Sequence, residues 1–428
     1  MPPRAIILNM FYTGLGIARS LGEHGIPVIG LTSHKGIYGN FTRYAHVRRC
    51  PDSREQPDAL LAFLLRLADE FEGGVIFPTR DDDVLFLERF RQQLESRFKL
   101  ALPQSAALQA SLDKWETYQW ARKTGVPTPA CWVISSKEEL ERIAPEIPLP
   151  CVLKPISAHV WRKGANWRIV GSRKAIPVTS KEELFAEYDT ISQADGRILV
   201  QEMVSGTEDC LRIAACYMDS DSNFVAGFTA QKLLQVPVGF GTGCIVQAQD
   251  FPELKPIAAA LLRAIRFSGI AEVEFKWDSR SGQYKLIEIN PRPWDQHRLG
   301  SASGVDLIHI AYCSYAGLPL PPVTEQRSGA KWVAEDALFL RLLKSCWRRD
   351  GQLRSLLWLA SGKRIYGIWS AADPLPLFAF IALRFGPDLF TSVARYLGSV
   401  TGRLISRRIP GKKGLLYDNY LQKPNCKP

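Results

Sequence analysis

The sequence predicts a multidomain protein with a parallel α/β domain, then an α+β region of antiparallel sheets with covering helices, then a basic, mainly helical extension. A chain of 428 residues is too long for one hydrophobic core, so two or three domains are expected. Strand and helix signals alternate over the first hundred residues, which is typical of a parallel sheet. After Pro150, strand signals outnumber helix signals, which indicates antiparallel sheets.

The N-terminal elements follow from the spacing of apolar residues. Short apolar runs predict strands, whereas apolar residues three or four positions apart predict helices. Short runs occur at AIILNM (5–10), IPVIGLT (26–32), GVIFPT (74–79) and KLALPQ (99–104), and helices are expected within 14–25, 58–71 and 82–98. Because helices separate the strands, we expect the strands to run parallel in one sheet.

The following region is predicted to begin with a linking helix at 111–125. Strand-like runs then occur at CVLKPI, RIVGS, RILVQEMV, CLRIAACYM, FVAGFTAQKLL, IAEVEFKW and YKLIEIN. Helices are expected at roughly 181–194, 253–267 and 303–316, and the Pro-rich segment 317–323 leads out of the region. This order predicts antiparallel sheets covered by a few helices.

The composition is that of a globular protein, with 46% hydrophobic and 10% aromatic residues. Nine cysteines without a CxxC pair predict reduced core thiols, not a disulfide framework or a zinc site. No signal peptide or membrane span is expected, since the apolar run 374–383 is too short for a bilayer and is followed by Arg384. A cytoplasmic protein is therefore expected.

The net charge of +11 is concentrated in the C-terminal tail. Residues 341–428 contain 16 Lys and Arg against 4 Asp, whereas the preceding part of the chain is close to neutral. The simpler interpretation is a solvated helical appendage. Peripheral contact with the inner face of an anionic membrane, or with an acidic partner, stays open. No nucleic-acid partner is predicted, because the tail lacks interleaved aromatic and basic residues.

Two N-terminal motifs each have two interpretations. Gly14 and Gly16 follow the first strand, but Arg19 stands where a dinucleotide-binding motif has its third glycine, so the pair predicts a tight turn. Three aspartates at 81–83 begin a helix, where the helix dipole and capping favour them. A substrate-facing role for one of the three is also consistent with ligand binding at strand ends.

The sharpest candidate site lies on the strands IAEVEFKW and KLIEIN, which the turn DSRSGQ joins. Side-chain alternation in this predicted hairpin places on one face Glu274, Leu286, Glu288 and Asn290. Two carboxylates placed close together favour a bound cation, and hard oxygen ligands suit Mg²⁺. The alternative is a solvated sheet face on which Lys276 and Lys285 neutralise the acids.

Two further segments favour the metal site over this alternative. Lys154 lies within the apolar strand CVLKPI, where a buried charge needs a partner. The strand ILVQEMV is followed by a turn at Gly206 and by Glu208. Such a strand end can offer backbone groups at 201–204 to a flat base and a carboxylate to sugar hydroxyls.

The ordered set of motifs resembles the ATP-grasp superfamily of carboxylate–amine ligases, especially bacterial members with a GLG-RSLG start and an EINPRxW end. The matching motifs are DK before a helix, VLKP, QEMVSG, VEF and EINPRP, and the similarity spans roughly residues 4–325. The resemblance implies a Rossmann-like pre-ATP-grasp domain, an ATP-grasp domain with lid and large subdomains, and the extension, at 1–110, 111–325 (lid about 125–204, large about 205–325) and 326–428.

The resemblance also implies ATP and Mg²⁺ as cofactors, with two ions expected and Mn²⁺ as a substitute. Lys114 and Lys154 would contact the phosphates, and Glu208 would bind the ribose. The adenine hinge would consist of Gln201, Glu202, Met203 and Val204. The magnesium ligands would be Glu274, Glu288 and Asn290.

The remaining assignments concern the reacting groups. Arg292 would stabilise the transferred phosphoryl group, and Lys232 and Arg212 would hold the acyl phosphate or the substrate carboxylate. For Lys232 and Arg212, a cross-strand ion pair is the alternative. The segment 157–174 has only two glycines where the family has a glycine-rich loop, so Arg162 or Lys163 would reach the phosphates instead. Untested substrate contacts are Asp295, His297 and Arg298.

The implied activity is that of an ATP- and Mg²⁺-dependent ligase, which activates a carboxylate as an acyl phosphate and joins it to an amine. One alternative is a kinase-like ATP-grasp phosphotransferase. Another is a nucleotide-binding scaffold that docks through its basic tail. The expected partners are small-molecule carboxylates and amines, and a homodimer is left open.

Overall fold

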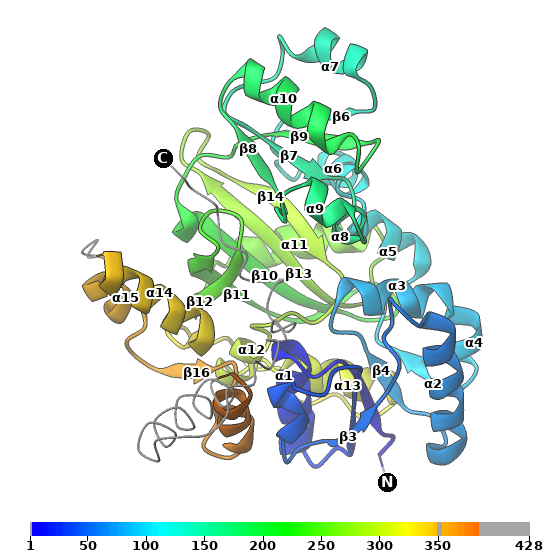
Figure 1. Cartoon of the computed structure of the whole chain (residues 1–428). Coiled ribbons are helices and arrows are strands. Elements are labelled where there is room, and N and C mark those ends of the chain that lie inside the picture. The colour runs from blue at the N-terminus through cyan, green and yellow to red at the C-terminus, as the bar shows by residue number, and fades with distance from the viewer. Residues whose placement is uncertain (1, 349–352, 385–428) are drawn as a thin grey trace, which may run out of the picture.

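The computed structural model describes residues 2–348 and 353–384, whose strands form three sheets (Figure 1). The sheet that contains β1 to β5 lies in the lower part of Figure 1, the small sheet of β6 to β9 lies at the top, and the large sheet that contains β10 to β16 lies between them. This mixture of one parallel and two largely antiparallel sheets agrees with the predicted α/β and α+β composition.

The N-terminal sheet has five parallel strands in the order β3-β2-β1-β4-β5. Alternate β1 residues face opposite layers, because Ile6 packs with Leu64 of α2 whereas Ile7 packs with Ile17 of α1. The predicted parallel sheet is therefore confirmed. Its elements are β1 (Ala5–Leu8), α1 (Tyr12–Glu23), β2 (Val28–Thr32), η1 (Tyr38–Phe41), β3 (His46–Arg49), α2 (Pro57–Phe71), β4 (Val75–Phe77), α3 (Asp81–Arg89), α4 (Arg91–Glu95) and β5 (Lys99–Leu100).

The β1–α1 connection lies at residues 9–11, whereas Gly14 and Gly16 lie inside α1, so the prediction that they form the turn is wrong. A Cβ atom at Gly14 would lie 1.9 Å from the carbonyl oxygen of Asn9. A Cβ atom at Gly16 would lie 2.6 Å from Nε2 of His297. Both glycines are thus explained by close packing within the protein.

The predicted linking helix at 111–125 is present as α6 (Lys114–Lys123), whereas the preceding helix α5 (Ser105–Leu112) was not predicted. Asp113 separates them because its backbone is extended and its Oδ1 accepts the backbone N–H of Glu116 at 3.0 Å. This side chain caps α6 in the ordinary way. The predicted helix began at Ser111, within the last turn of α5, and therefore ran across this boundary.

A four-stranded antiparallel sheet with the order β6-β9-β7-β8 follows. The predicted strand RIVGS is wrong, because Arg168 and Ile169 end helix α9 and residues 170–172 form a turn, with Val170 in the same core as Trp161. The elements are β6 (Cys131–Ile134), α7 (Lys137–Ile143), β7 (Cys151–Pro155), α8 (Ala158–Arg162), α9 (Asn166–Ile169), β8 (Ile176–Val178), α10 (Lys181–Ile191) and β9 (Ile198–Glu202).

The largest sheet has seven strands in the order β14-β13-β10-β11-β12-β15-β16, and only its β15–β16 pair is parallel. On one face Ala214 and Phe275 pack against α11, and on the other Ile213 and Ala215 share a core with α1 and α13. The elements are η2 (Glu208–Cys210), β10 (Leu211–Met218), β11 (Phe224–Val236), β12 (Thr242–Ala248), α11 (Leu254–Ala264), β13 (Gly269–Asp278), β14 (Gln283–Asn290), α12 (Arg298–Ala302), α13 (Leu307–Tyr315), β15 (Lys331–Val333), α14 (Glu335–Arg348), α15 (Leu353–Leu359) and β16 (Arg364–Tyr366).

The described part of the C-terminal extension is built into this fold, so the expectation of a solvated appendage is wrong for it. Strands β15 and β16 extend the large sheet, and Ile368 is buried against Leu15 of α1. Arg19 of α1 donates through Nε to Oδ2 of Asp373 at 2.9 Å, and both side chains are almost fully buried. The charge-rich residues 385–428 lie outside the described part of the chain.

Two expectations from composition can be compared with the described residues. No helix among them is long and apolar enough to cross a membrane. Seven cysteines, at 50, 131, 151, 210, 216, 244 and 313, carry free thiols, and most of them are buried. The free thiols agree with the prediction of reduced core cysteines.

Replacing Asp373 by alanine should destabilise the protein by about 3–5 kcal/mol, because the buried Arg19 guanidinium would lose its counter-ion. Chemical denaturation measures this loss. The control is Asp69→Ala, which removes an exposed partner of Arg97 and should cost less than about 1 kcal/mol. Equal, small effects of both substitutions would contradict a structural role for the extension.

Candidate active site

The predicted hairpin of β13 and β14 is present, and it gathers acidic side chains at the end of β14. The two strands are antiparallel neighbours, with Glu274 opposite Glu288 and Glu272 opposite Asn290. Cross-strand neighbours on one face lie about 4.5–5.5 Å apart at their Cβ atoms. The three predicted metal ligands therefore do lie together, on the face that alternation assigned to them.

A β-bulge corrects one detail of that prediction. Between the pairs Glu274–Glu288 and Phe275–Leu286, strand β14 contains one extra residue, Ile287. An extra residue reverses the side-chain alternation beyond it. Leu286 consequently faces the core, where it is fully buried, and the prediction that it shares a face with Glu288 is wrong.

Glu272 is a buried acid of this cluster that sequence reasoning missed. Its side chain accepts a hydrogen bond at Oε2 from Nδ2 of Asn290 at 2.9 Å, whereas Oε1 is buried without a partner in the described part of the chain. Burial and the neighbouring Glu274 raise the pKa of Glu272 to about 8. The signal was available, because Glu272 precedes Glu274 by two strand positions.

Lys232 of β11 neutralises part of the cluster. Its Nζ lies 2.5 Å from Oε1 of Glu274, and both side chains are buried. Strand β10 separates β11 from β13, so the lysine reaches across it to make this pair. Burial would lower the pKa of Lys232, but Glu274 and Glu272 outweigh it and raise the pKa. The ion-pair alternative thus describes the contact that Lys232 makes here.

Two further lysines approach the cluster from other elements. Lys114, the first residue of α6, places Nζ 3.8 Å from Oε2 of Glu288. Lys154 of β7 donates to Oε1 of Gln201 at 3.1 Å, so the partner expected for this buried charge is an amide. Burial lowers the pKa of Lys154 to about 8. Burial would raise the pKa of Glu288, but the lysines outweigh it and lower the pKa.

Tyr118 of α6 joins these groups and was also missed. Its Oη is fully buried and lies 2.9 Å from Oε1 of Gln201 and 2.8 Å from the carbonyl oxygen of Ile287. The hydroxyl therefore contacts both the amide that binds Lys154 and the bulge residue of β14. A tyrosine on an ordinary helix face gives no sequence signal for such a role.

Residues 202–204 connect the small sheet to the large one. Oε2 of Glu202 lies 3.1 Å from Nζ of Lys285, and the carbonyl oxygen of Val204 accepts from Nζ of Lys276 at 3.0 Å. Among the described residues, the backbone N–H of Val204 donates to no acceptor. Glu208 accepts the backbone N–H of Gly239 at 2.8 Å, so its carboxylate contacts the loop between β11 and β12.

Arg292 follows β14 and extends towards the N-terminal sheet. Its Nε donates to Oδ1 of Asp81 at 2.7 Å, and its Nη1 donates to the carbonyl oxygen of Pro293 at 3.1 Å. Arg162, at the end of α8, donates to Oδ2 of the same Asp81 at 3.0 Å. The basic segment 157–174, in which the sequence lacks a glycine-rich loop, forms helices α8 and α9.

The proposed role of Arg212 is contradicted by its position. Arg212 pairs with Phe275 in the β10–β13 ladder, and its guanidinium stacks on the Phe251 ring at 4.7 Å. Glu274 pairs instead with Ile213, one residue further along β10. Since adjacent strand residues face opposite sides, Arg212 lies on the face covered by α11, away from the acids.

The segment after Arg292 packs on helix α1. Oδ1 of Asp295 accepts from Oγ1 of Thr13 at 2.7 Å, and Nε2 of the buried His297 lies 3.1 Å from the carbonyl oxygen of Thr13. Arg298 forms an ion pair with Glu23 at 2.9 Å. Asp295, His297 and Arg298 therefore join two parts of the fold, and their role as substrate contacts stays a prediction.

The acid cluster is suited to a cation, although it is not a preformed cage. Within the described ranges, no three His, Cys, Asp or Glu side chains are grouped closely enough to hold a metal ion. Asn290 donates through Nδ2 to both glutamates beside it, which leaves Oδ1 as an acceptor. Two carboxylates and an amide oxygen fit Mg²⁺, which binds few protein ligands and shares phosphate oxygens.

Comparison with known proteins identifies a similar family. The family described as "Carbamoyl-phosphate synthase L chain, ATP binding domain" matches residues 113–322, which include the acid cluster and its lysines. Over these residues the chain is similar to the ATP-grasp superfamily of carboxylate–amine ligases. This finding confirms the resemblance drawn from the ordered motifs.

Two relatives and one solved structure show the extent of the ATP-grasp similarity. The chain is 21% identical to a D-aspartate ligase of Enterococcus faecium over 84% of this chain and 83% of the relative. A D-alanine–D-alanine ligase of Ectopseudomonas mendocina is 26% identical over 43% of this chain and 56% of the relative, so only about half of that ligase is matched. The biotin carboxylase domain dimer of Hydrogenobacter thermophilus 2-oxoglutarate carboxylase, in complex with MgADP, ADP and bicarbonate, has a TM-score of 0.62 at 19% identity, covering 77% and 73% of the two chains. That structure shows the shared fold.

Affinity for the anion ADP should fall as the pH rises above about 8. Burial lowers the pKa of Lys154 to about 8, so its ammonium group loses its positive charge in that range. Titration calorimetry between pH 7 and 9.5 should show that the logarithm of the ADP association constant falls with rising pH, with a slope that approaches one proton per ADP. In Lys154→Arg the guanidinium stays charged, so this fall should disappear. Affinity of the wild type that does not change with pH would contradict the placement of Lys154 at the nucleotide.

Proposed function

We propose that this protein is an ATP- and Mg²⁺-dependent ligase that activates a substrate carboxylate as an acyl phosphate and joins it to an amine. The observation that carries the proposal is the acid cluster of the β13–β14 hairpin, which faces lysines from three other elements within an ATP-grasp chain. Two of its relatives, a D-aspartate ligase and a D-alanine–D-alanine ligase, are named for amino acids. An amino acid or a related amino-bearing acid is therefore the substrate class that we propose.

In this proposal the chain binds the phosphates and aligns the reacting groups. Lys114 and Lys154 hold the phosphate oxygens, because both ammonium groups lie beside the acids that receive the metal. Arg292 stabilises charge on the phosphoryl group as the substrate carboxylate attacks it. Mg²⁺ held by Glu274, Glu288 and Asn290 would neutralise the phosphate charge. The amine then attacks the acyl carbon and displaces phosphate.

We also propose the nucleotide-binding positions. Glu202, Met203 and Val204 form the adenine hinge, to which the free N–H of Val204 and the carbonyl oxygen of Glu202 contribute, and Gln201 orients Lys154. Glu208 binds the ribose hydroxyls after releasing the Gly239 N–H. Lys232 holds the acyl phosphate once a metal ion takes over the charge of Glu274.

The larger assignments stay predictions of the same proposal. The N-terminal parallel sheet serves as the Rossmann-like pre-ATP-grasp domain at 1–110, with the ATP-grasp domain at 111–325 and its lid at about 125–204. Two metal ions, replacement by Mn²⁺, and a homodimer are part of it. Peripheral membrane or acidic-partner contact would rest on the extension at 326–428, of which 385–428 lies outside the described residues.

A screen of carboxylic acids and amines for release of ADP and phosphate tests the activity. Formation of an amide with one ADP per bond is the expected result. Transfer of phosphate without amide formation would instead support the kinase-like alternative. Tight Mg·ATP binding without turnover across a broad set of acids would favour the scaffold.

Glu288→Gln should weaken Mg·ATP binding by about a hundredfold and remove its dependence on Mg²⁺, because the neutral amide is a poor ligand for the cation. Titration calorimetry with and without Mg²⁺ measures both effects. The matched control is Glu95→Gln, which removes a charge from an exposed helix pair with Arg91. Unchanged Mg·ATP affinity in Glu288→Gln would show that the hairpin is not the metal site.

A further inference from the structure

Asp81 is an N-terminal residue that contacts two arginines from other parts of the chain. It is the first residue of α3, which follows β4 of the parallel sheet. Arg292 reaches one of its carboxylate oxygens at 2.7 Å and Arg162 reaches the other at 3.0 Å. The side chains of Asp81 and Arg292 are 17% and 16% exposed, so this pair is largely shielded from water.

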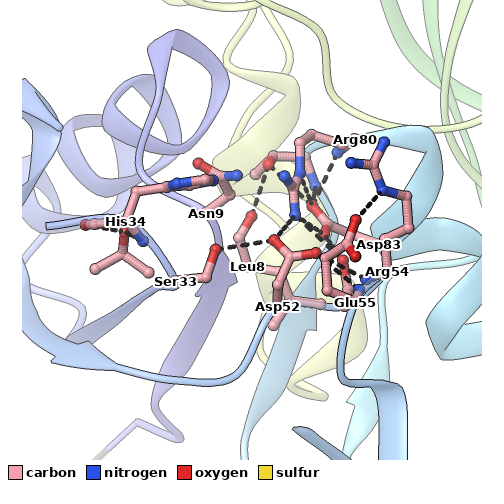
Figure 2. Close-up of polar contacts among 12 residues, drawn as sticks. Leu8, Asn9, Ser33, His34, Asp52, Arg54, Glu55, Arg80 and Asp83 are labelled. Carbon is pink, nitrogen blue, oxygen red and sulfur yellow. Dashed lines mark hydrogen bonds and ion pairs between the residues drawn. The ribbon is translucent and has the colours of Figure 1, made fainter. Parts of the chain in front are cut away.

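The neighbouring Asp83 makes a separate set of contacts and does not bind these two arginines. Asp83 is buried, accepts from Oγ of Ser53 at 2.8 Å and pairs with Arg80 at 2.9 Å. Figure 2 shows this network, in which Arg80 also approaches Asp52. Asp83 therefore has the capping role predicted for the aspartates at 81–83, and it fixes the start of α3.

We propose that Asp81 is a positioning residue of the ATP site, which holds the Arg292 guanidinium towards the phosphoryl group and ties helix α8 to the N-terminal sheet. This inference rests on the proposed function for its phosphoryl part. Arg292 uses Nε for Asp81 and Nη1 for the Pro293 carbonyl oxygen. Its Nη2 makes no hydrogen bond within the described part of the chain, so that nitrogen stays available to a phosphoryl oxygen.

The charge state of Asp81 agrees with this role. Burial would raise its pKa, but Arg292 and Arg162 outweigh burial and hold the pKa well below its usual range. The carboxylate is therefore ionised at neutral pH. An ionised acceptor that contacts Nε fixes a planar guanidinium more firmly than a neutral one.

The second contact gives Asp81 a role in the segment 157–174. Helix α8 is anchored by Trp161, which is buried and donates through Nε1 to Oδ2 of Asp195 at 3.1 Å. The side chain of the next residue, Arg162, is 40% exposed, and its guanidinium forms an ion pair with Asp81. In Figure 1, α3 and α8 lie side by side, in agreement with this contact. The Asp81 carboxylate thus connects helix α8 and the end of β14 to the N-terminal sheet.

The phosphoryl part is tested with Mg·ADP plus aluminium fluoride, a mimic of the transferred group, against Mg·ADP alone. In Asp81→Asn, calorimetry should show at least tenfold weaker binding of the mimic, with Mg·ADP affinity within threefold of wild type. Asp82→Asn is the matched control. It removes the same charge one residue later, and Asp82 makes no hydrogen bond or ion pair within the described ranges. The affinity of Asp82→Asn for the mimic and its affinity for Mg·ADP should both stay within threefold of wild type. Unchanged affinity for the mimic in Asp81→Asn would overturn this part.

The lid contact is tested without nucleotide, by trypsin cleavage after Arg162 and Lys163 in the full chain. Asp81→Asn should be cleaved at least fivefold faster than wild type at these positions, while Asp82→Asn is cleaved at the wild-type rate. Melting temperatures equal to wild type exclude general unfolding as the cause. Equal cleavage of all three proteins would overturn the contact. Failure of wild type to bind Mg·ADP would instead contradict the proposed function, and the cleavage result would still stand.

Discussion

The crowding of carboxylates on the β13–β14 hairpin is the constraint on which the rest of the site depends. Glu272, Glu274 and Glu288 share one partly buried face, and like charges placed there raise one another's pKa unless cations neutralise them. Lysines from β7, β11 and α6 meet that need in the described chain. Because these cations come from separate elements, neutralising the hairpin brings the small and large sheets together.

The N-terminal sheet is connected to the same site through charge. Asp81 receives Arg292 from the end of β14 and Arg162 from α8, while its neighbour Asp83 fixes the start of helix α3. The C-terminal extension contributes from another side, since Asp373 pairs with Arg19 of α1. The Asp81–Arg292 and Arg19–Asp373 pairs are largely shielded from water, where removing one partner costs far more than at the surface. The active-site geometry and the stability of the fold therefore depend on the same kind of interaction.

The sequence was sufficient for features that depend on local order. Alternation predicted the β13–β14 hairpin with Glu274, Glu288 and Asn290 on one face, and a charge within an apolar strand predicted a partner for Lys154. The sequence was not sufficient for features that depend on contacts between segments far apart in the chain. The bulge at Ile287, the opposite face of Arg212 and the burial of Asp373 all depend on which strands or helices become neighbours.

A crystal structure of the protein with Mn²⁺ and ADP would test the central claim most directly, because the anomalous signal of manganese locates the ion. The account predicts a Mn²⁺ peak at about 2.0–2.3 Å from carboxylate oxygens of Glu274 and Glu288 and from the side-chain oxygen of Asn290, with Lys232 moved away from Glu274. A peak elsewhere, with the Lys232–Glu274 ion pair intact, would contradict it.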